Sequence, residues 1–321
     1  MFGKMRYQNK INKMKRVLNF IENNVPLFLT LAAPVGLIFP YFSFLKNSIT
    51  YLLMIVLFFT FMKMDVLKII QSFKEPLILL YLVVLDLGVF PLVVFLIFKL
   101  FGFDSNYLSA MLLFSAVPAG VASPAFTEIQ KGNAPLSVAI VIITHFVAPF
   151  TIPLLFFLLL RRVVDINYVG VMLTMLQLIG LPLLLSFIVK YIFKERANFL
   201  KERTSLFTLI PLFLITLTVI SVNFDFIIRN PLETIKYILI SYPVYFLFLF
   251  GSLFATSRMS TGDRIAAAST KTFMNISIGI VLSLSFLEAK ASLILTLAQI
   301  PWSTMMLPAS IIAKNLRKKR S

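Results

Sequence analysis

The 321-residue sequence contains no cysteine and only one histidine, His145. The absence of cysteine excludes disulfide bonds and thiolate metal sites, although it leaves the redox compartment open. One histidine cannot form a zinc cluster by itself, and no motif serine is paired with it as a nucleophile. No phosphate-binding loop of the P-loop type is present either. We therefore expect no enzymatic activity, no cofactor, no metal centre and no ATP-driven pump.

Acidic residues are also scarce. The sequence has 13 Asp and Glu against 30 Lys and Arg, which gives a formal net charge of +17. Nucleic-acid-binding proteins show such an excess, but here the basic residues cluster at the ends of apolar segments, for example at 190–203 and 314–320. The positive-inside rule describes this distribution in membrane proteins. We expect no nucleic-acid partner, and a multi-pass protein of the plasma membrane with both termini in the cytoplasm.

Hydrophobic residues make up 59% of the sequence, whereas soluble domains contain roughly 45–50%. The apolar segments do not alternate with polar residues as the strands of a membrane barrel would. The basic segment 1–24 shows no cleavable signal peptide and is expected to be a surface helix or a disordered tail. The sequence predicts an all-α polytopic membrane protein with ten transmembrane helices, at residues 25–44, 49–63, 76–100, 107–130, 134–160, 168–192, 204–223, 235–256, 264–286 and 290–313.

The ten predicted helices divide near Arg161 into two sets of five. Because five is an odd number, the second set must enter the membrane in the opposite orientation. The third helix of each set has a proline near its middle, Pro91 and Pro243, and the fourth helix of each set is interrupted. We predict two inverted five-helix repeats, 25–160 and 161–321, with a site where the two broken helices cross at the midplane.

The fourth predicted helix is interrupted by Pro118, Gly120 and Pro124. Proline removes backbone hydrogen bonds and glycine permits a turn, so these residues predict a non-helical break. Unwound backbone at membrane depth persists only inside protein or beside water, where it can bind an ion or an anion. The alternative is a proline kink in a packed helix. Ser123 and Thr127, one turn apart, favour a binding site.

The ninth predicted helix carries a polar cluster without proline, which includes Thr270, Lys271, Thr272 and Asn275. Asp86 lies equally deep in the third predicted helix. A charge near the bilayer centre costs at least ~2.5–3.5 kcal/mol on insertion scales, so it needs partners and usually lines a functional cavity. These buried charges point to a transporter.

Several segments resemble the bile acid:sodium symporter superfamily, which also includes arsenite exporters and bacterial carriers of small organic acids. The resemblance implies a panel domain and a core domain, crossing fourth and ninth helices, and alternating access for an organic anion. It covers nearly all ten predicted helices and is clearest at Phe61–Met64, Pro118–Ser123, Gly132, Leu136–Val138, Ala148, Pro149 and Asn275.

Most of the side chains that bind sodium in sodium-coupled members of this family are replaced. Ser123 and Ser137 are retained, but proline follows Ser123, and Thr270 stands where those members have a glutamate that bridges two sodium ions. Because sodium needs several oxygen ligands, bound sodium is doubtful. The other replacements are Asp86 and Met274 in place of glutamines and Val141 in place of a threonine.

Lys271 is placed to supply the missing positive charge at the carbonyl end of the first half-helix. We hypothesise an Asp86–Lys271 ion pair at the former sodium position. Three roles are open for it: a static replacement that makes the carrier sodium-independent, proton coupling through Asp86, or packing alone. His145 shares a face of the fifth helix with Ser137, and it is either a neutral residue bonded to a neighbouring helix or a proton relay.

We predict a secondary active transporter of a small organic anion. The anion is expected to meet Lys271, the helix ends, and Ser123, Thr127, Thr272 and Asn275. One alternative is a metalloid efflux permease, against which the absence of a soft cysteine ligand counts. The other is a sodium:organic-acid symporter that uses backbone oxygens. The sequence leaves open whether the protein is a monomer or a homodimer.

Overall fold

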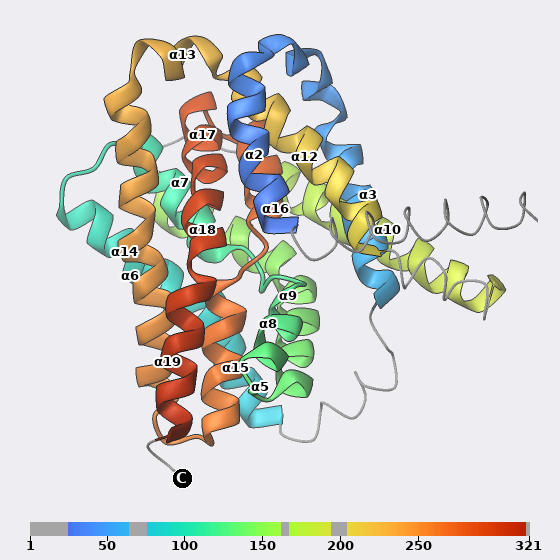
Figure 1. Cartoon of the computed structure of the whole chain (residues 1–321), viewed down its shortest axis with the longest axis vertical. Coiled ribbons are helices and arrows are strands. Elements are labelled where there is room, and N and C mark those ends of the chain that lie inside the picture. The colour runs from blue at the N-terminus through green and yellow to red at the C-terminus, as the bar shows by residue number, and fades with distance from the viewer. Residues whose placement is uncertain (1–24, 64–75, 162–166, 194–203, 319–321) are drawn as a thin grey trace, which may run out of the picture. The chain divides into compact units, whose positions relative to one another are not determined.

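The computed structural model describes residues 25–63, 76–161, 167–193 and 204–318, so the predicted leader 1–24 lies outside the described residues. The described chain is helical and has no β-strand (Figure 1). The predicted all-α, multi-pass class is therefore confirmed, whereas the ten transmembrane helices and the inverted repeats stay predictions. Within these segments six helices are long and apolar enough to cross a membrane, namely Pro40–Met62, Pro76–Leu100, Ala134–Leu160, Tyr168–Phe193, Pro231–Ala255 and Thr261–Phe286, and the bent pair Ala289–Thr304 with Met306–Lys318 makes up to seven.

The chain divides into two compact units, and each takes segments from both predicted repeats. The first comprises Met1–Lys63 and Pro182–Ser221, and the second comprises Met64–Leu181 and Val222–Ser321. The predicted repeat boundary after residue 160 is thus not a boundary between compact units. The described helices of the first unit are α2 (Val25–Ile38), the 3-10 helix η1 (Pro40–Ser48), α3 (Ile49–Lys63), the C-terminal half of α10 (Tyr168–Phe193) and nearly all of α12 (Thr204–Val222).

Two contacts show how the first unit is packed. A Cβ atom added at Gly36 of α2 would lie only 3.0 Å from the side chain of Ile220 in α12, so glycine allows these helices to approach closely. The ammonium of Lys190 in α10 donates a hydrogen bond of 2.7 Å to the carbonyl of Phe61 in α3. Small residues and side-chain-to-carbonyl bonds of this kind join helices in lipid, where the hydrophobic effect between helices is absent.

The second unit contains the two broken helices. Its α7 and the α15–α16 segment are almost wholly buried, and α15 packs against α14 and α19 (Figure 1). The elements are α5 (Pro76–Val84), the π-helical turn η2 (Leu85–Val89), α6 (Phe90–Leu100), α7 (Ser105–Ala116), α8 (Ser123–Ile129), α9 (Ala134–Leu160), the N-terminal half of α10, α13 (Phe224–Arg229), α14 (Pro231–Ala255), α15 (Thr261–Thr272), α16 (Ile276–Phe286), α17 (Ala289–Leu297), α18 (Gln299–Thr304) and α19 (Met306–Lys318).

Side-chain caps fix where the helices that build the site begin. Asp104 caps α7 by accepting a hydrogen bond of 3.0 Å from the backbone N–H of Tyr107. Ser260 caps α15 through the N–H of Asp263 at 3.2 Å, and Asn133 caps α9. Each cap satisfies a backbone donor that the first helical turn leaves without an intrahelical partner.

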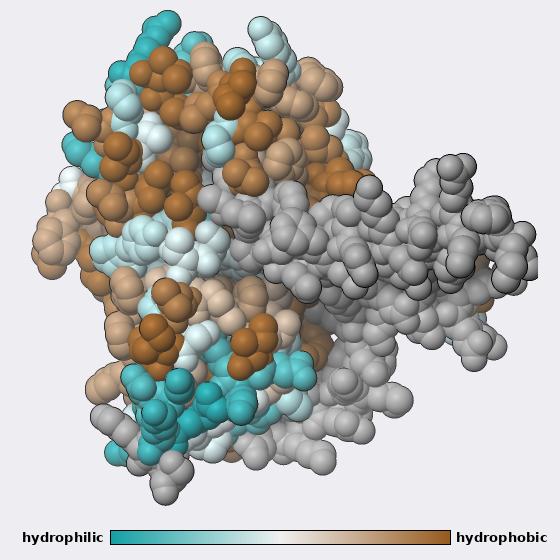
Figure 2. Space-filling model, in the orientation of Figure 1, coloured by the Kyte–Doolittle hydropathy of each residue, from teal (hydrophilic) through white to brown (hydrophobic). Residues whose placement is uncertain are grey.

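Apolar side chains also cover much of the outside of the second unit. Leu77, Leu154 and Phe254 are 80%, 54% and 83% exposed, respectively. Figure 2 shows hydrophobic residues over much of the visible face, with hydrophilic residues near the C-terminal end of α19, where Lys314 and Lys318 are exposed. Extended apolar surface of this kind is unusual on a soluble monomer and suits contact with lipid.

Candidate substrate and ion site

The two broken helices of the second unit touch at their breaks. Residues 117–122 separate α7 from α8, and residues 273–275 separate α15 from α16. The backbone N–H of Asn275 donates a hydrogen bond of 2.8 Å to the carbonyl of Pro118. Each break therefore satisfies part of the backbone of the other, which is how non-helical chain persists where lipid surrounds the protein.

The first break fits against the second because residue 120 is glycine. A Cβ atom at Gly120 would lie 1.8 Å from the carbonyl oxygen of Phe273, which is an impossible contact. Pro118 lies within the break as expected. Pro124, which the sequence placed in the break, instead lies in the first turn of α8, where a missing N–H costs no helical hydrogen bond.

Lys271 extends from the last turn of α15 into an enclosure of carbonyls and aromatic rings. Its Nζ donates hydrogen bonds to the backbone carbonyls of Asp86, at 2.6 Å, and Ser115, at 2.5 Å. The same atom lies 5.4 Å from the ring centroid of Phe90 and 4.9 Å from that of Phe248. The lysine is 1% exposed. Carbonyl oxygens and ring faces both attract cations, so this enclosure is a cation site that a side chain of the protein fills.

Two prolines explain why these carbonyls are available to Lys271. In η2 the N–H of Phe90 bonds to the carbonyl of Leu85. The same π-helical pattern would pair the carbonyl of Asp86 with the N–H of residue 91, but residue 91 is a proline and has no N–H. Ser115 lies one residue before the end of α7, and three residues later stands Pro118. Both carbonyls therefore lack a helical donor and accept from the ammonium instead.

The predicted Asp86–Lys271 ion pair is not formed in this arrangement. Among the ion pairs within the described residues none involves Asp86, and Lys271 contacts its peptide carbonyl rather than its carboxylate. The physical reason is that the peptide carbonyl of Asp86 lacks a helical hydrogen-bond donor and accepts from the ammonium. Asp86 is itself buried, at 4% exposure, so the two residues are neighbours although they are not paired.

Helix α9 holds both breaks through two adjacent residues. The hydroxyl oxygen of Thr144 accepts a hydrogen bond of 3.2 Å from the N–H of Ala119 in the first break. The Nε2 atom of His145 lies 3.2 Å from Nδ2 of Asn275 in the second break, and its Nδ1 lies 2.7 Å from the carbonyl of Val141. His145 thus contacts the second break, and its two predicted roles both stay predictions. Sequence reasoning missed Thr144, although it lies seven residues after Ser137 and hence on the same face of the helix.

The predicted hydroxyl ligands fall into three groups. Ser123 and Ser137, the retained family ligands, lie with their Oγ atoms 3.5 Å apart, and Thr127 donates to the carbonyl of Ser123 at 2.8 Å. Thr270 donates to carbonyls of its own helix, so its hydroxyl is engaged there. Thr272 is fully buried, and within the described chain its hydroxyl has no hydrogen-bond partner. The structure therefore brings together the two serines, and within the described residues neither threonine is hydrogen-bonded to them.

Among the predicted ligand residues only Asn275 is partly exposed, because Asp86, Ser123, Thr127, Ser137, Thr270, Lys271 and Thr272 are all buried. A substrate that reaches the crossing in this arrangement meets the Asn275 turn. Two carbonyls and two rings enclose the ammonium of Lys271 in this arrangement, and direct contact between an anion and that ammonium stays a prediction.

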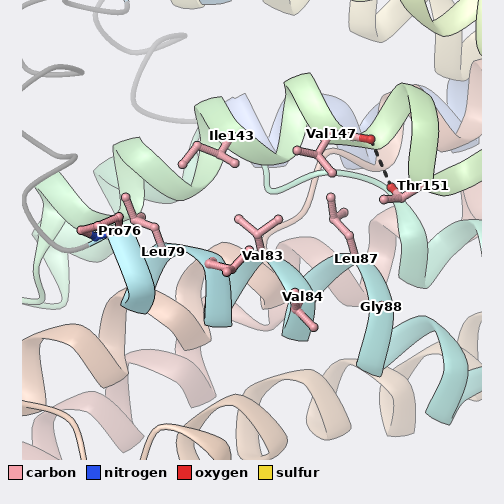
Figure 3. A pocket seen from close by; sticks show the side chains of 10 residues that line it. Pro76, Leu79, Val83, Val84, Leu87, Gly88, Ile143, Val147 and Thr151 are labelled. Atoms are coloured by element: carbon pink, nitrogen blue, oxygen red, sulfur yellow. Dashed lines mark hydrogen bonds between the residues drawn. The ribbon is translucent and has the colours of Figure 1, made fainter.

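An apolar groove adjoins the site in the second unit. Figure 3 shows Leu79, Val83 and Leu87, from α5 and η2, facing Ile143 and Val147 of α9. The groove has a volume of about 400 Å³. Its walls belong to the same segments that carry Asp86 and His145, but it offers hardly any polar atom. It suits an apolar chain rather than the charged group of an anion.

A comparison with known protein families decides what kind of protein this is. The profile of the Sodium Bile acid symporter family matches residues 50–230, which is more than half of the chain. The chain belongs to this family. Its members are transporters rather than enzymes, so the chain is a multi-pass membrane transporter, as its apolar helices indicate.

Individual relatives of this symporter-family chain agree with that assignment. A Bacillus subtilis (strain 168) protein named an uncharacterized sodium-dependent transporter, YocS, is 23% identical over 220 residues, which are 68% of each chain. A probable sodium/metabolite cotransporter of chloroplasts, BASS1 of Arabidopsis thaliana, is 30% identical over 115 residues, or 36% of this chain and 29% of that one. The BASS1 protein of Oryza sativa subsp. japonica is 35% identical over 102 residues, or 32% and 25%.

Proposed function

We propose that this family member carries a small organic anion by alternating access, with Lys271 as a built-in cation that replaces an exchangeable ion. The observation that supports the proposal is the enclosure of the ammonium by the carbonyls of Asp86 and Ser115 and by two aromatic rings. A tethered cation neutralises those carbonyls in every cycle without dissociating. We therefore infer that transport is independent of sodium.

The surroundings of Asn275 favour an anion as the transported species. The 11-residue helix α16 begins directly after Asn275, and its first turn lies at the crossing of the two breaks. The N-terminus of a helix carries a partial positive charge, which attracts carboxylates and phosphates. No acidic residue occurs between 264 and 287, so the sequence there does not oppose an anion.

A thermal-unfolding series on the purified full-length protein tests the built-in cation. Sodium is exchanged for potassium at constant ionic strength, in the wild type and in Lys271→Ala. We expect no sodium effect on the wild type, whereas sodium stabilises Lys271→Ala because the vacated carbonyls can hold it. A ligand at about 100 times its Kd stabilises by ~2.7 kcal/mol, which such a measurement resolves. Lys290→Ala is the matched control, since that lysine is partly exposed and bound to acidic side chains.

A second candidate is a sodium:organic-acid symporter. It is favoured by the neighbouring hydroxyls of Ser123 and Ser137 and by the sodium-dependent names of the relatives. Stabilisation of the wild type by sodium would establish this candidate and contradict the first. Saturable uptake into proteoliposomes of ionised monocarboxylates, with arsenite as the competing substrate class, tests the anion itself. Uptake of arsenite without any carboxylate would leave neither candidate standing.

A further inference from the structure

The hydrogen bonds of His145 define the protonation of its ring. Its Nδ1 lies 2.7 Å from the carbonyl oxygen of Val141, which can only accept, so Nδ1 carries a proton. In a neutral ring Nε2 is then bare and accepts a hydrogen bond from Nδ2 of Asn275, 3.2 Å away. The amide of Asn275 therefore directs its NH₂ group toward the histidine.

The other end of that amide is what a substrate meets. Asn275 is the N-terminal capping residue of α16, yet its side chain makes no capping hydrogen bond. Its side-chain oxygen accepts no hydrogen bond within the described residues, and the residue is partly exposed. Because His145 binds the NH₂ group, the crossing presents the amide oxygen, which is a hydrogen-bond acceptor. A carboxylate is also only an acceptor, so this orientation of the amide disfavours its binding.

We propose that His145 sets which end of the Asn275 amide faces the opening, and thereby couples the binding of an anion to one proton. A proton from water binds Nε2 of His145, and both ring nitrogens become donors. The amide of Asn275 then turns, so that its oxygen accepts from Nε2 and its NH₂ group faces the incoming anion. When the anion leaves, the proton returns to water and the amide turns back. This inference rests on the proposed function, because it takes the opening at Asn275 as the anion site.

The rest of helix α9 keeps this arrangement in register. Thr144, the residue before His145, accepts from the N–H of Ala119 in the first break, and Asn275 itself donates its N–H to Pro118. A shift of the second break away from α9 would thus break contacts to the first break as well. His145 acts as a positioning residue on a crossing whose backbone is fixed, and only the amide needs to turn.

The charged and titratable groups around the ring are few and are mostly engaged. Asp86 on η2 and Lys271 on α15 are both buried. The elements packed against α9 carry these two and further groups, namely Tyr81 on α5, Tyr107 on α7, Glu128 on α8, and Asp263 and Arg264 on α15. Of the latter, Tyr81, Asp263 and Arg264 bond to Ala255, Asn133 and Leu253, respectively.

The first test exploits the fact that His145 is the only histidine of the chain. In full-length protein labelled with [¹⁵N]histidine, NMR reports this ring alone. We expect protonated Nδ1 and bare Nε2 near neutral pH, and protonation of both nitrogens on acidification. Asn275→Ala should leave the proton on Nδ1, which the carbonyl of Val141 fixes, but should shift the Nε2 resonance because Nε2 loses its hydrogen-bond donor. Ser285→Ala, at the far end of α16, should leave the spectrum unchanged. A ring protonated at Nε2 alone near neutral pH overturns the proposal without any substrate.

The second test measures binding of pyruvate, an ionised monocarboxylate probe, to the same protein at about pH 7.5 and about pH 3.5, a range wide enough to include protonation of a buried ring. Replacing an acceptor by a donor should tighten wild-type binding by about tenfold at the lower pH. His145→Gln and Asn275→Ala should bind pyruvate equally at the two pH values, and Ser285→Ala, at the far end of α16, should behave as the wild type. Equal wild-type binding at both pH values overturns the coupling alone. Absence of binding at both overturns the proposed anion class and the coupling with it, whereas the ring tautomer still reports the His145–Asn275 arrangement.

Discussion

The two breaks that cross in the second unit are built in different ways. The first, residues 117–122, contains Pro118 and Gly120, so its own sequence forbids a continuous helix. The second, residues 273–275, contains neither proline nor glycine. Its residues would tolerate a helix, so the reason for the break must lie in what surrounds it.

The partners of the second break supply that reason. Asn275 gives its backbone N–H to Pro118 and its side-chain NH₂ group to His145. One turn earlier, Lys271 is held by two carbonyls from other helices. The first break is therefore encoded locally, whereas the second depends on tertiary contacts, including one with the first. A substitution that changes the first break should therefore alter both breaks. A substitution that removes a side-chain contact of the second break should alter only the second.

The largest effect is expected from Gly120→Ala. The added methyl group would lie 1.8 Å from the carbonyl oxygen of Phe273, so the two breaks could not meet. We expect a destabilisation of at least about 4 kcal/mol and loss of transport, measured by thermal unfolding and uptake into proteoliposomes. The control is Gly88→Ala in η2, where an added Cβ atom meets nothing within 4 Å. Equal behaviour of the two variants would mean that the breaks do not touch.

The next largest effect is expected from Lys271→Met, which keeps the length of the side chain and removes its charge. The carbonyls of Asp86 and Ser115 then lose their donor, and we expect a destabilisation of about 3 kcal/mol. Thermal unfolding in detergent measures it. Lys290→Met, at a partly exposed lysine, should cost below about 1 kcal/mol. A loss for Lys271→Met no greater than that of the control would contradict the idea that partners of α15 hold the second break.

A smaller effect is expected from Thr144→Val, which preserves the shape of the side chain but removes its oxygen. The N–H of Ala119 in the first break then lacks an acceptor, and the stability should fall by about 1–2 kcal/mol. Thr151→Val on the same helix is the control, since that hydroxyl bonds weakly, at 3.4 Å, to Val147 of its own helix. If both variants unfold alike, the first break does not need α9, and its local encoding is stronger than we infer.

These comparisons also show which parts of the site the sequence could predict. Pro118 and Gly120 marked the first break, because proline and glycine act on the backbone wherever they stand. The helix boundaries followed from hydropathy, as in α9, predicted at 134–160 and found at Ala134–Leu160. The depth of Lys271 was evident, but its partners were not, since an ammonium binds a carbonyl as readily as a carboxylate.

The role of Pro91 illustrates what was out of reach. The sequence showed a proline near the middle of a helix, yet only the register of η2 shows that its missing N–H frees the carbonyl of Asp86. Likewise, Thr144 appeared as one more polar residue of α9 until the N–H of Ala119 was found beside it. Such contacts join residues far apart in the chain, and no local pattern records them.

The smallest effect concerns the start of the first broken helix. Partial burial works against ionisation of Asp104, but hydrogen bonds from Tyr107 and Lys290, together with the charge of Lys290, hold its pKa below the ordinary value of 3.8. Because the carboxyl binds its proton more weakly in the folded state, its contribution to stability is fully present above pH 3.8 and is lost as the pH falls through the lower folded-state value. The side chain of Asp104 is about half exposed, so we expect its charge to contribute below about 1 kcal/mol to the free energy of unfolding.

The free energies of unfolding of wild type and Asp104→Asn should differ by this amount near neutral pH and converge at the acidic end. Asp225→Asn, at an exposed carboxylate of α13, is the control and should match the wild type. A constant difference between wild type and Asp104→Asn would show that the cap of α7 acts through geometry rather than charge.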